Sequence, residues 1–251
     1  MFFDLAIVDN HHTIIGKHKC NYDRSKDIAA NIYNAYKKYF SNYKLNFLGV
    51  AVSNNIPFKE DILYRVYRFN FNRYNLKQSL EKLFKIDVYI NEETYLASLA
   101  SSYDVEGSLL YVLIDKKISN SFVVDNELIE LEEDIDLRKN ENLNSLCSKD
   151  VMKTKFLANN YDDDFIGTYF LSNDSKCKDL VKEWANNLDK YLLDIIKELP
   201  VNNIVFAGYI GAYYKYYKEY MKIDKNVNCS YVLNHRELAL LGVSHLIFKD
   251  N

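Results

Sequence analysis

Short apolar runs alternate with helical patterns along this chain, and the alternation restricts its fold more than any other feature. Residues 45–52 and 203–207 are apolar runs with the length of a buried strand. Residues 25–43 and 178–199 carry apolar side chains three or four positions apart, as the buried face of a helix requires. Strands that alternate with helices predict an α/β protein.

The other predicted elements continue this order in two halves, each of which opens with strands. Further strands are predicted at residues 2–8, 13–18, 87–90, 109–114, 121–124 and 229–233, and further helices at 75–84, 93–103, 212–221 and 236–248, with several short helices in 142–174. Gly107-Ser108 marks the boundary between the halves. We predict an N-terminal lobe of residues 1–106, a C-terminal lobe of residues 107–235, and a closing helix in residues 236–251 that packs back toward the N-terminal lobe.

The composition is that of a globular protein and argues against two classes of partner. Of the 251 residues, 48% are hydrophobic and 27% charged, and the formal net charge is −3. The basic excess of nucleic-acid-binding proteins is missing, and no apolar run approaches the ~18 residues of a membrane span. The first residues lack the basic and apolar regions of a signal peptide. We expect a cytoplasmic protein that binds neither nucleic acid nor membrane.

The cysteines do not form a metal-binding pattern. Cys20, Cys147, Cys177 and Cys229 lie far apart, and no Cys-x-x-Cys pair or Cys/His cluster occurs. This spacing predicts four reduced thiols, as in cytoplasmic proteins, and no metal ligands.

Glycine is scarce, and its scarcity bears on function. The chain has seven glycines, whereas average usage of about 7% predicts roughly 17 or 18. Loops that cradle phosphate need glycine, because it reaches positive φ and lets backbone N–H groups approach the oxygens. The 22 tyrosines and the many asparagines and lysines also fit an A/T-rich genome, which lowers glycine without any loss of chemistry.

Five stretches resemble, in the same order, motifs of one protein family. They are residues 5–15, L-G-V-A-V-S-N at 48–54, V-Y-I-N-E-E-T-Y-L-A-S-L-A at 88–100, N-I-V-F-A-G-Y-I-G at 203–211 and L-A-L-L-G-V at 238–243. They are similar to the second and third strands and to the I-G-I-A-V-P-G, V-x-V-E-N-D-A-N-A-A-A-L-A, I-V-I-G-G-G-V-S and A-A-L-G-A motifs of the ROK family (repressors, open reading frames and sugar kinases). The resemblance implies a two-lobed actin-like ATPase fold of the ribonuclease H-like type, and a homodimer.

The resemblance places Glu93 at the position of the family's catalytic aspartate and Glu92 at the asparagine before it. A sugar kinase needs a carboxylate near the attacking hydroxyl, so Glu93 is the candidate base and Glu92 a candidate substrate contact. Glutamate reaches one methylene further than aspartate, and such a displacement lowers the rate. The alternative is that both acids complement the dipole at the start of a helix.

The phosphate loops depart most from the family pattern. The first, D-I-G-G-T, should precede the first matched strand, so either that N-terminal strand is gone or residues 1–4 are a stub of it. The second, G-T-G-I-G-G-G, falls on residues 115–121, where every glycine is replaced and Asp115 would repel a phosphate. Lys116 and Lys117 either supply replacement charge or are solvated in a tight turn.

The sugar-binding and zinc motifs of the family have no counterpart after Val124. Their place is taken by an acidic stretch, residues 130–136, which predicts a solvated loop or a partner contact. At the adenosine end, Gly208, Tyr209 and Gly211 are candidate nucleotide-binding residues, although a strand-to-helix turn explains the glycines equally well. The tyrosines of residues 209–220 could stack a ligand, form an interface or pack one helix face into the core.

Three functions follow from these observations. The coincident loss of phosphate loops, aspartate and sugar motif favours a non-catalytic sugar-kinase-like protein that needs no cofactor and binds a sugar, a second copy or another protein. A divergent hexose or N-acetyl amino sugar kinase would use Glu93 as base and require ATP and Mg²⁺. A ROK-type transcriptional regulator fits less well, because those members carry an N-terminal helix-turn-helix module and here a strand is predicted from Phe2.

Overall fold

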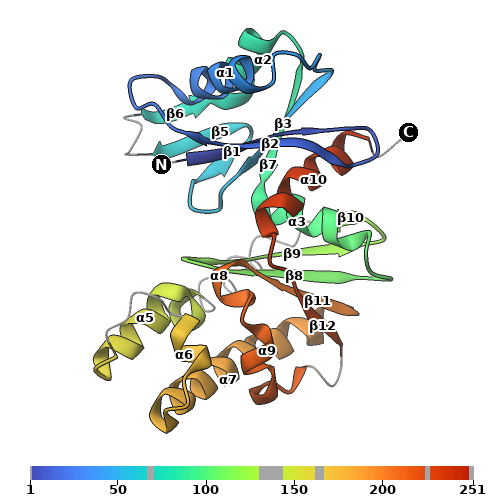
Figure 1. Ribbon diagram of the computed structural model, residues 1–251. Helices are drawn as coiled ribbons and strands as arrows, with labels where there is room; N and C mark the ends of the chain where they lie inside the picture. The colour runs from blue at the N-terminus through green and yellow to red at the C-terminus, as the bar shows by residue number, and fades with distance from the viewer. Residues whose placement is uncertain (1, 67–70, 130–143, 162–166, 224–226, 249–251) are drawn as a thin grey trace. The chain divides into compact units, whose positions relative to one another are not determined.

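The structure, a computed structural model, describes residues 2–66, 71–129, 144–161, 167–223 and 227–248 (Figure 1). The chain forms two compact units, Met1–Ala100 with Arg236–Asn251, and Ser101–His235. It passes between them within α3 (Glu93–Ser102) and at the start of α10 (His235–Ile247). All but the first residue of the C-terminal helix therefore belongs to the same unit as the N-terminal strands.

The N-terminal unit contains two separate strand pairs and a small antiparallel sheet. In the first pair, β1 (Phe2–Val8) is antiparallel to β2 (Ile14–Asn21). In the second, β3 (Phe47–Val52) is parallel to β7 (Asp87–Glu92). The small sheet has the strand order β4 (Phe58–Lys59), β5 (Ile62–Val66), β6 (Phe71–Asn75). Phe2, Phe3 and Asp4 pair with the end of β2. These residues are part of the hairpin, and they are not the stub of a separate strand; Met1 lies outside the described residues.

Side-chain caps define where two helices of this unit begin. Before α1 (Ile28–Tyr39), the Asp27 carboxylate accepts a hydrogen bond from the Ala30 N–H at 2.7 Å. Before α2 (Leu76–Phe84), the Asn75 side chain accepts one from the Gln78 N–H at 2.9 Å. α1 is shorter than the predicted helix over 25–43, because the capping aspartate fixes its first turn.

The core of the N-terminal unit lies between these strands and helices, and glycine lets α10 approach closely. Buried side chains from α1, α2, β3 and β7 form one cluster, which includes Ala29, Leu48, Leu80 and Val88. A Cβ added at Gly49 would overlap the Val243 side chain of α10, and one at Gly242 would overlap the Leu96 carbonyl of α3. Packing therefore requires glycine at both positions.

The second unit is built on a five-stranded sheet with the order β10-β9-β8-β11-β12. The strands are β8 (Leu109–Ile114), β9 (Ile118–Val124), β10 (Glu127–Ile129), β11 (Asn203–Ala207) and β12 (Asn228–Tyr231). β8, β11 and β12 are mutually parallel, and β9 and β10 continue the sheet as antiparallel strands. Every residue of β8 and β11 is buried, as expected for central strands covered on both faces.

Helices and a dense aromatic cluster pack against this sheet. The helices are α5 (Lys149–Ala158), α6 (Gly167–Leu171) and α7 (Ser175–Glu198), followed after β11 by α8 (Gly208–Gly211), α9 (Tyr214–Tyr217) and the 3₁₀ turn η2 (Lys218–Tyr220). Trp184 of α7 is buried, and its indole N–H donates to the Cys147 carbonyl at 2.8 Å. Its ring meets that of Tyr217 edge to face, with centroids 5.0 Å apart.

The helix predicted over residues 212–221 is broken into short pieces. Within this range the chain forms α9 and η2, while α8 ends before it, and Tyr214 and Tyr217 are both buried in the core. Aromatic residues are weaker helix formers than alanine or leucine, so the packing of these rings against Trp184 and Phe206 decides the course of the backbone.

The described residues contain neither a membrane-spanning helix nor a metal-binding cluster of side chains. None of their helices is both long and apolar enough to cross a membrane. No group of three or more His, Cys, Asp or Glu side chains among them is arranged to hold a metal ion. All four cysteines are thiols, and Cys20, Cys147 and Cys177 are buried.

Candidate functional site

The register of two parallel strands brings Glu93 next to Ser53. Val52 of β3 lies opposite Glu92 of β7, so the residues that follow, Ser53 and Glu93, meet at the carboxyl edge of this pair. Ser53 Oγ donates a hydrogen bond to Glu93 Oε1 at 2.9 Å, and the backbone N–H of Asn54 donates to the same oxygen at 3.2 Å. The Glu93 carboxylate is thus held by the loop after β3.

A second bond ties this loop to the start of α3. Asn54 Nδ2 donates to Thr94 Oγ1 at 2.6 Å, and Thr94 is buried. Glu92, by contrast, is the exposed last residue of β7, and its N–H donates to Asn91 Oδ1 at 2.8 Å. Ser53 and Asn54 stand where the family resemblance has Pro-Gly, so the two replacements are the residues that engage the candidate base.

The turn that the resemblance aligns with the second phosphate loop is a tight hairpin between β8 and β9. Asp115 Oδ1 accepts a hydrogen bond from the Lys116 N–H at 2.9 Å. The Ile118 N–H donates to Asn144 Oδ1 at 2.6 Å, and the Asp115 N–H donates to the Lys117 carbonyl at 3.2 Å. A phosphate-binding loop presents such N–H groups to its ligand, whereas here protein oxygens accept their hydrogen bonds.

The glycines at the candidate adenosine end are required by packing. Gly208 has φ of +83° at the turn from β11 to α8. An added Cβ there would lie 2.7 Å from the Ile114 carbonyl oxygen, and one at Gly211 would lie 3.0 Å from the Phe206 carbonyl carbon. These backbone contacts demand glycine whether or not a nucleotide binds.

Tyr209 lies between the two glycines and is half-buried. The Lys149 ammonium sits 4.0 Å from the centre of its ring, a distance typical of a cation–π contact. Of the other tyrosines in residues 209–220, Tyr214 and Tyr217 are buried in the core and Tyr216 is exposed. The arrangement favours packing of one side of this segment, and it leaves the exposed ring for other contacts.

The structure groups the predicted residues by unit. Glu92 and Glu93 lie in the N-terminal unit, and Gly208, Tyr209 and Gly211 lie together at one turn of the second unit. Sequence reasoning assigned no role to Ser53 as a partner of Glu93, or to Lys149 as a partner of Tyr209. The acidic stretch of residues 130–136 lies outside the described residues.

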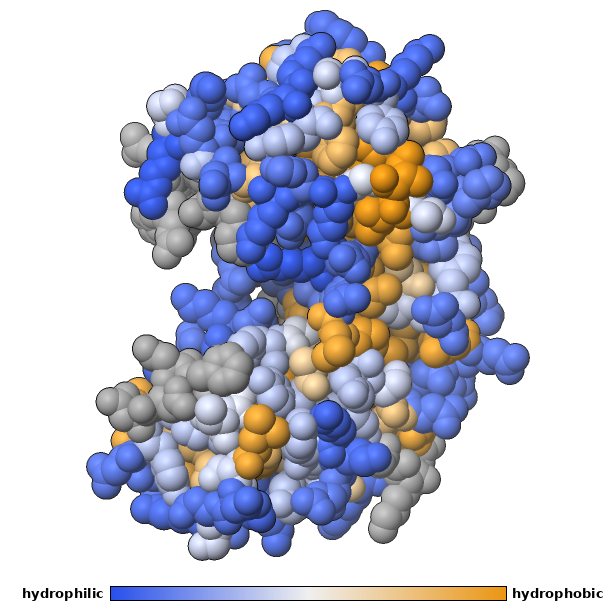
Figure 2. Space-filling view, viewed as in Figure 1, coloured by the Kyte–Doolittle hydropathy of each residue, from blue (hydrophilic) through white to orange (hydrophobic). Residues whose placement is uncertain are grey.

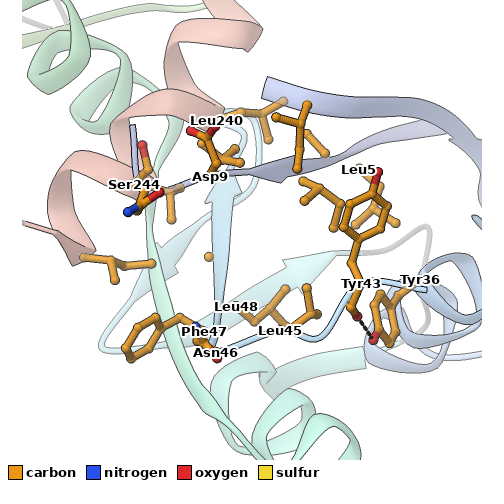
Figure 3. Close-up of a pocket in the computed structure, with 18 of the residues that line it drawn as sticks. Leu5, Asp9, Tyr36, Tyr43, Leu45, Asn46, Phe47, Leu48, Leu240 and Ser244 are labelled. Atoms are coloured by element: carbon orange, nitrogen blue, oxygen red, sulfur yellow. Dashed lines mark hydrogen bonds between the residues drawn. The ribbon is translucent and has the colours of Figure 1, made fainter. Parts of the chain in front are cut away.

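A cavity is found in the N-terminal unit, away from Glu93. Its volume is about 480 Å³, and it lies among β1, β3 and α10 (Figure 3). On the face shown in Figure 2, hydrophilic side chains cover most of this unit, while hydrophobic residues reach the surface near the C-terminal end of α10.

No protein-family model and no curated protein matches this sequence. Solved structures do match its fold. A ROK hexokinase from Thermus thermophilus is 15% identical with a TM-score of 0.78, over 98% of this chain and 95% of that one. A glucokinase from Parabacteroides distasonis is 11% identical with a TM-score of 0.79, over 100% of this chain and 95% of that one.

A ROK family transcriptional regulator, a homologue of the E. coli MLC protein, matches as well. It is 11% identical with a TM-score of 0.76, over 98% of this chain and 76% of the regulator. Sugar kinases and regulators thus share one fold with this chain at 11 to 15% sequence identity. The chain has the α/β fold of actin-like ATPases in the form found in ROK sugar kinases and ROK regulators, as its sequence motifs predict.

Proposed function

We propose that this protein keeps the ROK sugar-kinase fold for binding or assembly and does not transfer phosphate from ATP. The turn between β8 and β9 carries the proposal. Asp115 places a negative charge where the second phosphate loop would hold phosphate oxygens, and its carboxylate accepts the Lys116 N–H. A carboxylate at this point repels a nucleotide phosphate and competes with it for the same donor.

The surroundings of Glu93 support the same function. A general base must accept a proton from the sugar hydroxyl within hydrogen-bond reach. Glu93 Oε1 already accepts two hydrogen bonds, from Ser53 Oγ and from the Asn54 N–H. Glu93 therefore has a structural role in fixing the β3 loop to α3.

The adenosine end adds a third argument. Gly208 and Gly211 are explained by contacts with Ile114 and Phe206, so their retention does not require a nucleotide. The ligand in this proposal is a sugar, a second copy of the chain or another protein partner, with no ATP and no Mg²⁺.

One observation favours a second candidate, a divergent ATP-dependent sugar kinase. Glu93 lies at the carboxyl ends of β3 and β7, where the resemblance places the catalytic base. In that case Glu93 would take the hydroxyl proton, and Gly208, Tyr209 and Gly211 would contact the nucleotide. The two candidates differ in whether ATP binds at all.

Calorimetric titration of the full chain with ATP and Mg²⁺ tests the proposal. We expect no saturable heat up to about 1 mM nucleotide, whereas an active ROK hexokinase titrated in parallel gives a binding isotherm. An Asp115→Gly variant is the matched test of the repelling carboxylate, because it restores glycine at that position. Saturable ATP binding by the unmodified chain would overturn the proposal in favour of the kinase.

A further inference from the structure

Each of the two strand pairs in the N-terminal unit leaves the outer edges of both its strands without a partner among the described strands, and the edges of β1 and β3 are two of these. Among the described strands, β1 pairs only with β2, and β3 pairs only with β7. A strand edge carries a row of N–H and C=O groups that can pair with another extended chain. β1 and β3 therefore offer two such rows.

The cavity of about 480 Å³ lies between these two edges (Figure 3). Its lining includes the consecutive residues 4–10, from β1 and its turn, and the consecutive residues 44–49, which lead into and along β3. Successive side chains of a strand point to opposite faces, so a cavity on one face would be lined by alternate residues. Lining by consecutive residues indicates that the cavity meets the backbone edge of each strand.

Contacts with α10 establish the direction of β1. Arg236, at the start of the helix, has its guanidinium 3.6 Å from the carboxylate of Asp4, near the start of β1. Ser244, near the end of the helix, lies 2.8 Å from the Nδ1 of His12, just after β1. β1 therefore runs along α10 from its beginning to its end.

β3 runs in the opposite direction. Phe47, its first residue, meets Phe248 just beyond the end of α10, with ring centroids 6.1 Å apart. Gly49, two residues later, faces Val243, which is further back along the helix. A strand placed between β1 and β3 would be parallel to one and antiparallel to the other, and it would join the two pairs into a single sheet.

Both faces of such a strand would be covered by apolar side chains. Gly49 lies against Val243 of α10, whereas the adjacent Leu48 belongs to the buried cluster that contains Ala29 of α1 and Leu80 of α2. Adjacent residues of β3 thus contact different helices, which places α10 on one face and α1 with α2 on the other. Strands that are buried on both faces are continuous apolar runs, because neither set of alternate side chains meets water. A strand between β1 and β3 should therefore be apolar at successive positions.

The charges of the lining select an uncharged occupant. Its charged residues are Asp4, Asp9 and Lys44. Asp4 faces Arg236, and Asp9 Oδ1 accepts hydrogen bonds from two N–H groups of its own turn at 2.8 and 3.0 Å. Lys44 is exposed to solvent. A charged side chain inside the cavity would be buried without a counter-ion, which is costly.

We propose that this cavity binds an extended, uncharged segment of about six apolar residues from a partner protein, which adds a strand between β1 and β3. Main-chain hydrogen bonds to the two edges hold the segment, and apolar side chains pack on both of its faces. A small apolar molecule could fill the volume, but it would leave both rows of backbone groups unpaired.

A peptide-display library with six consecutive randomised positions, selected on the full chain, tests the chemistry of the occupant. We expect enrichment of uncharged runs of valine, isoleucine, leucine and phenylalanine. A proline at two alternate positions of an enriched peptide removes ladder donors and weakens binding by about tenfold or more. Failure to enrich any apolar run, or enrichment of charged sequences, overturns the proposal.

Amide hydrogen exchange then tests the location. With an enriched synthetic peptide bound, the alternate amides of residues 4–8 and 47–49 that point to the open edges should exchange at about a tenth of their former rate or slower, because both edges become paired. Ala6→Trp fills the cavity and lowers peptide affinity by about tenfold or more, while Asn21→Trp, exposed on β2 outside the lining, changes it less than about twofold. Thermal unfolding of both variants confirms that they fold. Binding that protects only one strand, or neither, contradicts strand addition.

Discussion

Ser53 Oγ donates a 2.9 Å hydrogen bond to Glu93 Oε1, joining the end of β3 to the first residue of α3. The pair lies where the parallel strands β3 and β7 end in register. The bond gives the glutamate a structural role. An aspartate at this position is one methylene shorter, so its carboxylate would reach Ser53 Oγ less well.

Removal of this bond should lower stability. We expect Ser53→Ala to reduce the free energy of unfolding by about 1 to 2 kcal/mol, because it leaves a half-buried carboxylate with one donor fewer. Ser41→Ala, at an exposed position, should change it by less than about 0.5 kcal/mol. In a double-mutant cycle with Glu93→Ala, which removes the acceptor, strictly additive losses would show that the two side chains do not interact.

Gly208 should be sensitive to substitution for a reason unrelated to ligands. At φ of +83°, with the Ile114 carbonyl 2.7 Å from the position of an added Cβ, Gly208→Ala should destabilise by about 2 kcal/mol or more. Gly16→Ala should cost less, because its added Cβ would meet only the outer edge of the Phe40 ring. Urea unfolding of both variants measures the difference. Equal effects would contradict the packing account of Gly208.

Tyr217 carries a buried hydroxyl for which no hydrogen-bond partner is found among the described residues. Burial also raises the pKa of this phenol well above its usual value. Tyr217→Phe removes the unsatisfied group and keeps the ring against Trp184. The variant should be as stable as the parent or more stable by about 1 kcal/mol, measured by thermal unfolding. A loss greater than about 1 kcal/mol would point to a partner for the hydroxyl.

Strands β3, β8 and β11 could be predicted from sequence, because each is a continuous apolar run. The small sheet β4-β5-β6 was not predicted. Residues 56–66 and 71–75 mix arginine, asparagine and tyrosine with apolar residues, so no clear apolar pattern marks their strands, which pair as antiparallel neighbours in sequence. β10 was not predicted either, because its three residues, Glu127–Ile129, are too few to show a strand pattern.

The candidate site was predictable only in part. The motif order placed Glu93 at the end of a strand, but its partner Ser53 depends on strand register, which sequence alone does not specify. The contact between Lys149 and Tyr209 joins elements 60 residues apart in the chain, and no local pattern predicts it.

Cys147 should be unreactive in the folded protein. Burial raises the pKa of its thiol from 9.0 to about 12, so at pH 8 almost no reactive thiolate is present. The folded state holds the thiol proton more tightly than the unfolded chain. The contribution of this proton to the stability of the folded state is therefore complete below pH 9, and it is lost as the pH rises toward about 12.

Mass spectrometry after maleimide labelling at pH 8 should find Cys147 unmodified in the folded chain and fully modified in denaturant. Rapid labelling of Cys147 under native conditions would show that its environment opens.

The most direct test of the central claim is a phosphotransfer assay of the full chain with ATP, Mg²⁺ and a panel of hexoses and N-acetyl amino sugars. The account predicts no turnover above background, and identical traces for the parent and the Glu93→Ala variant. Turnover that Glu93→Ala abolishes, in a variant that still folds, would contradict it and identify Glu93 as the base of a working sugar kinase.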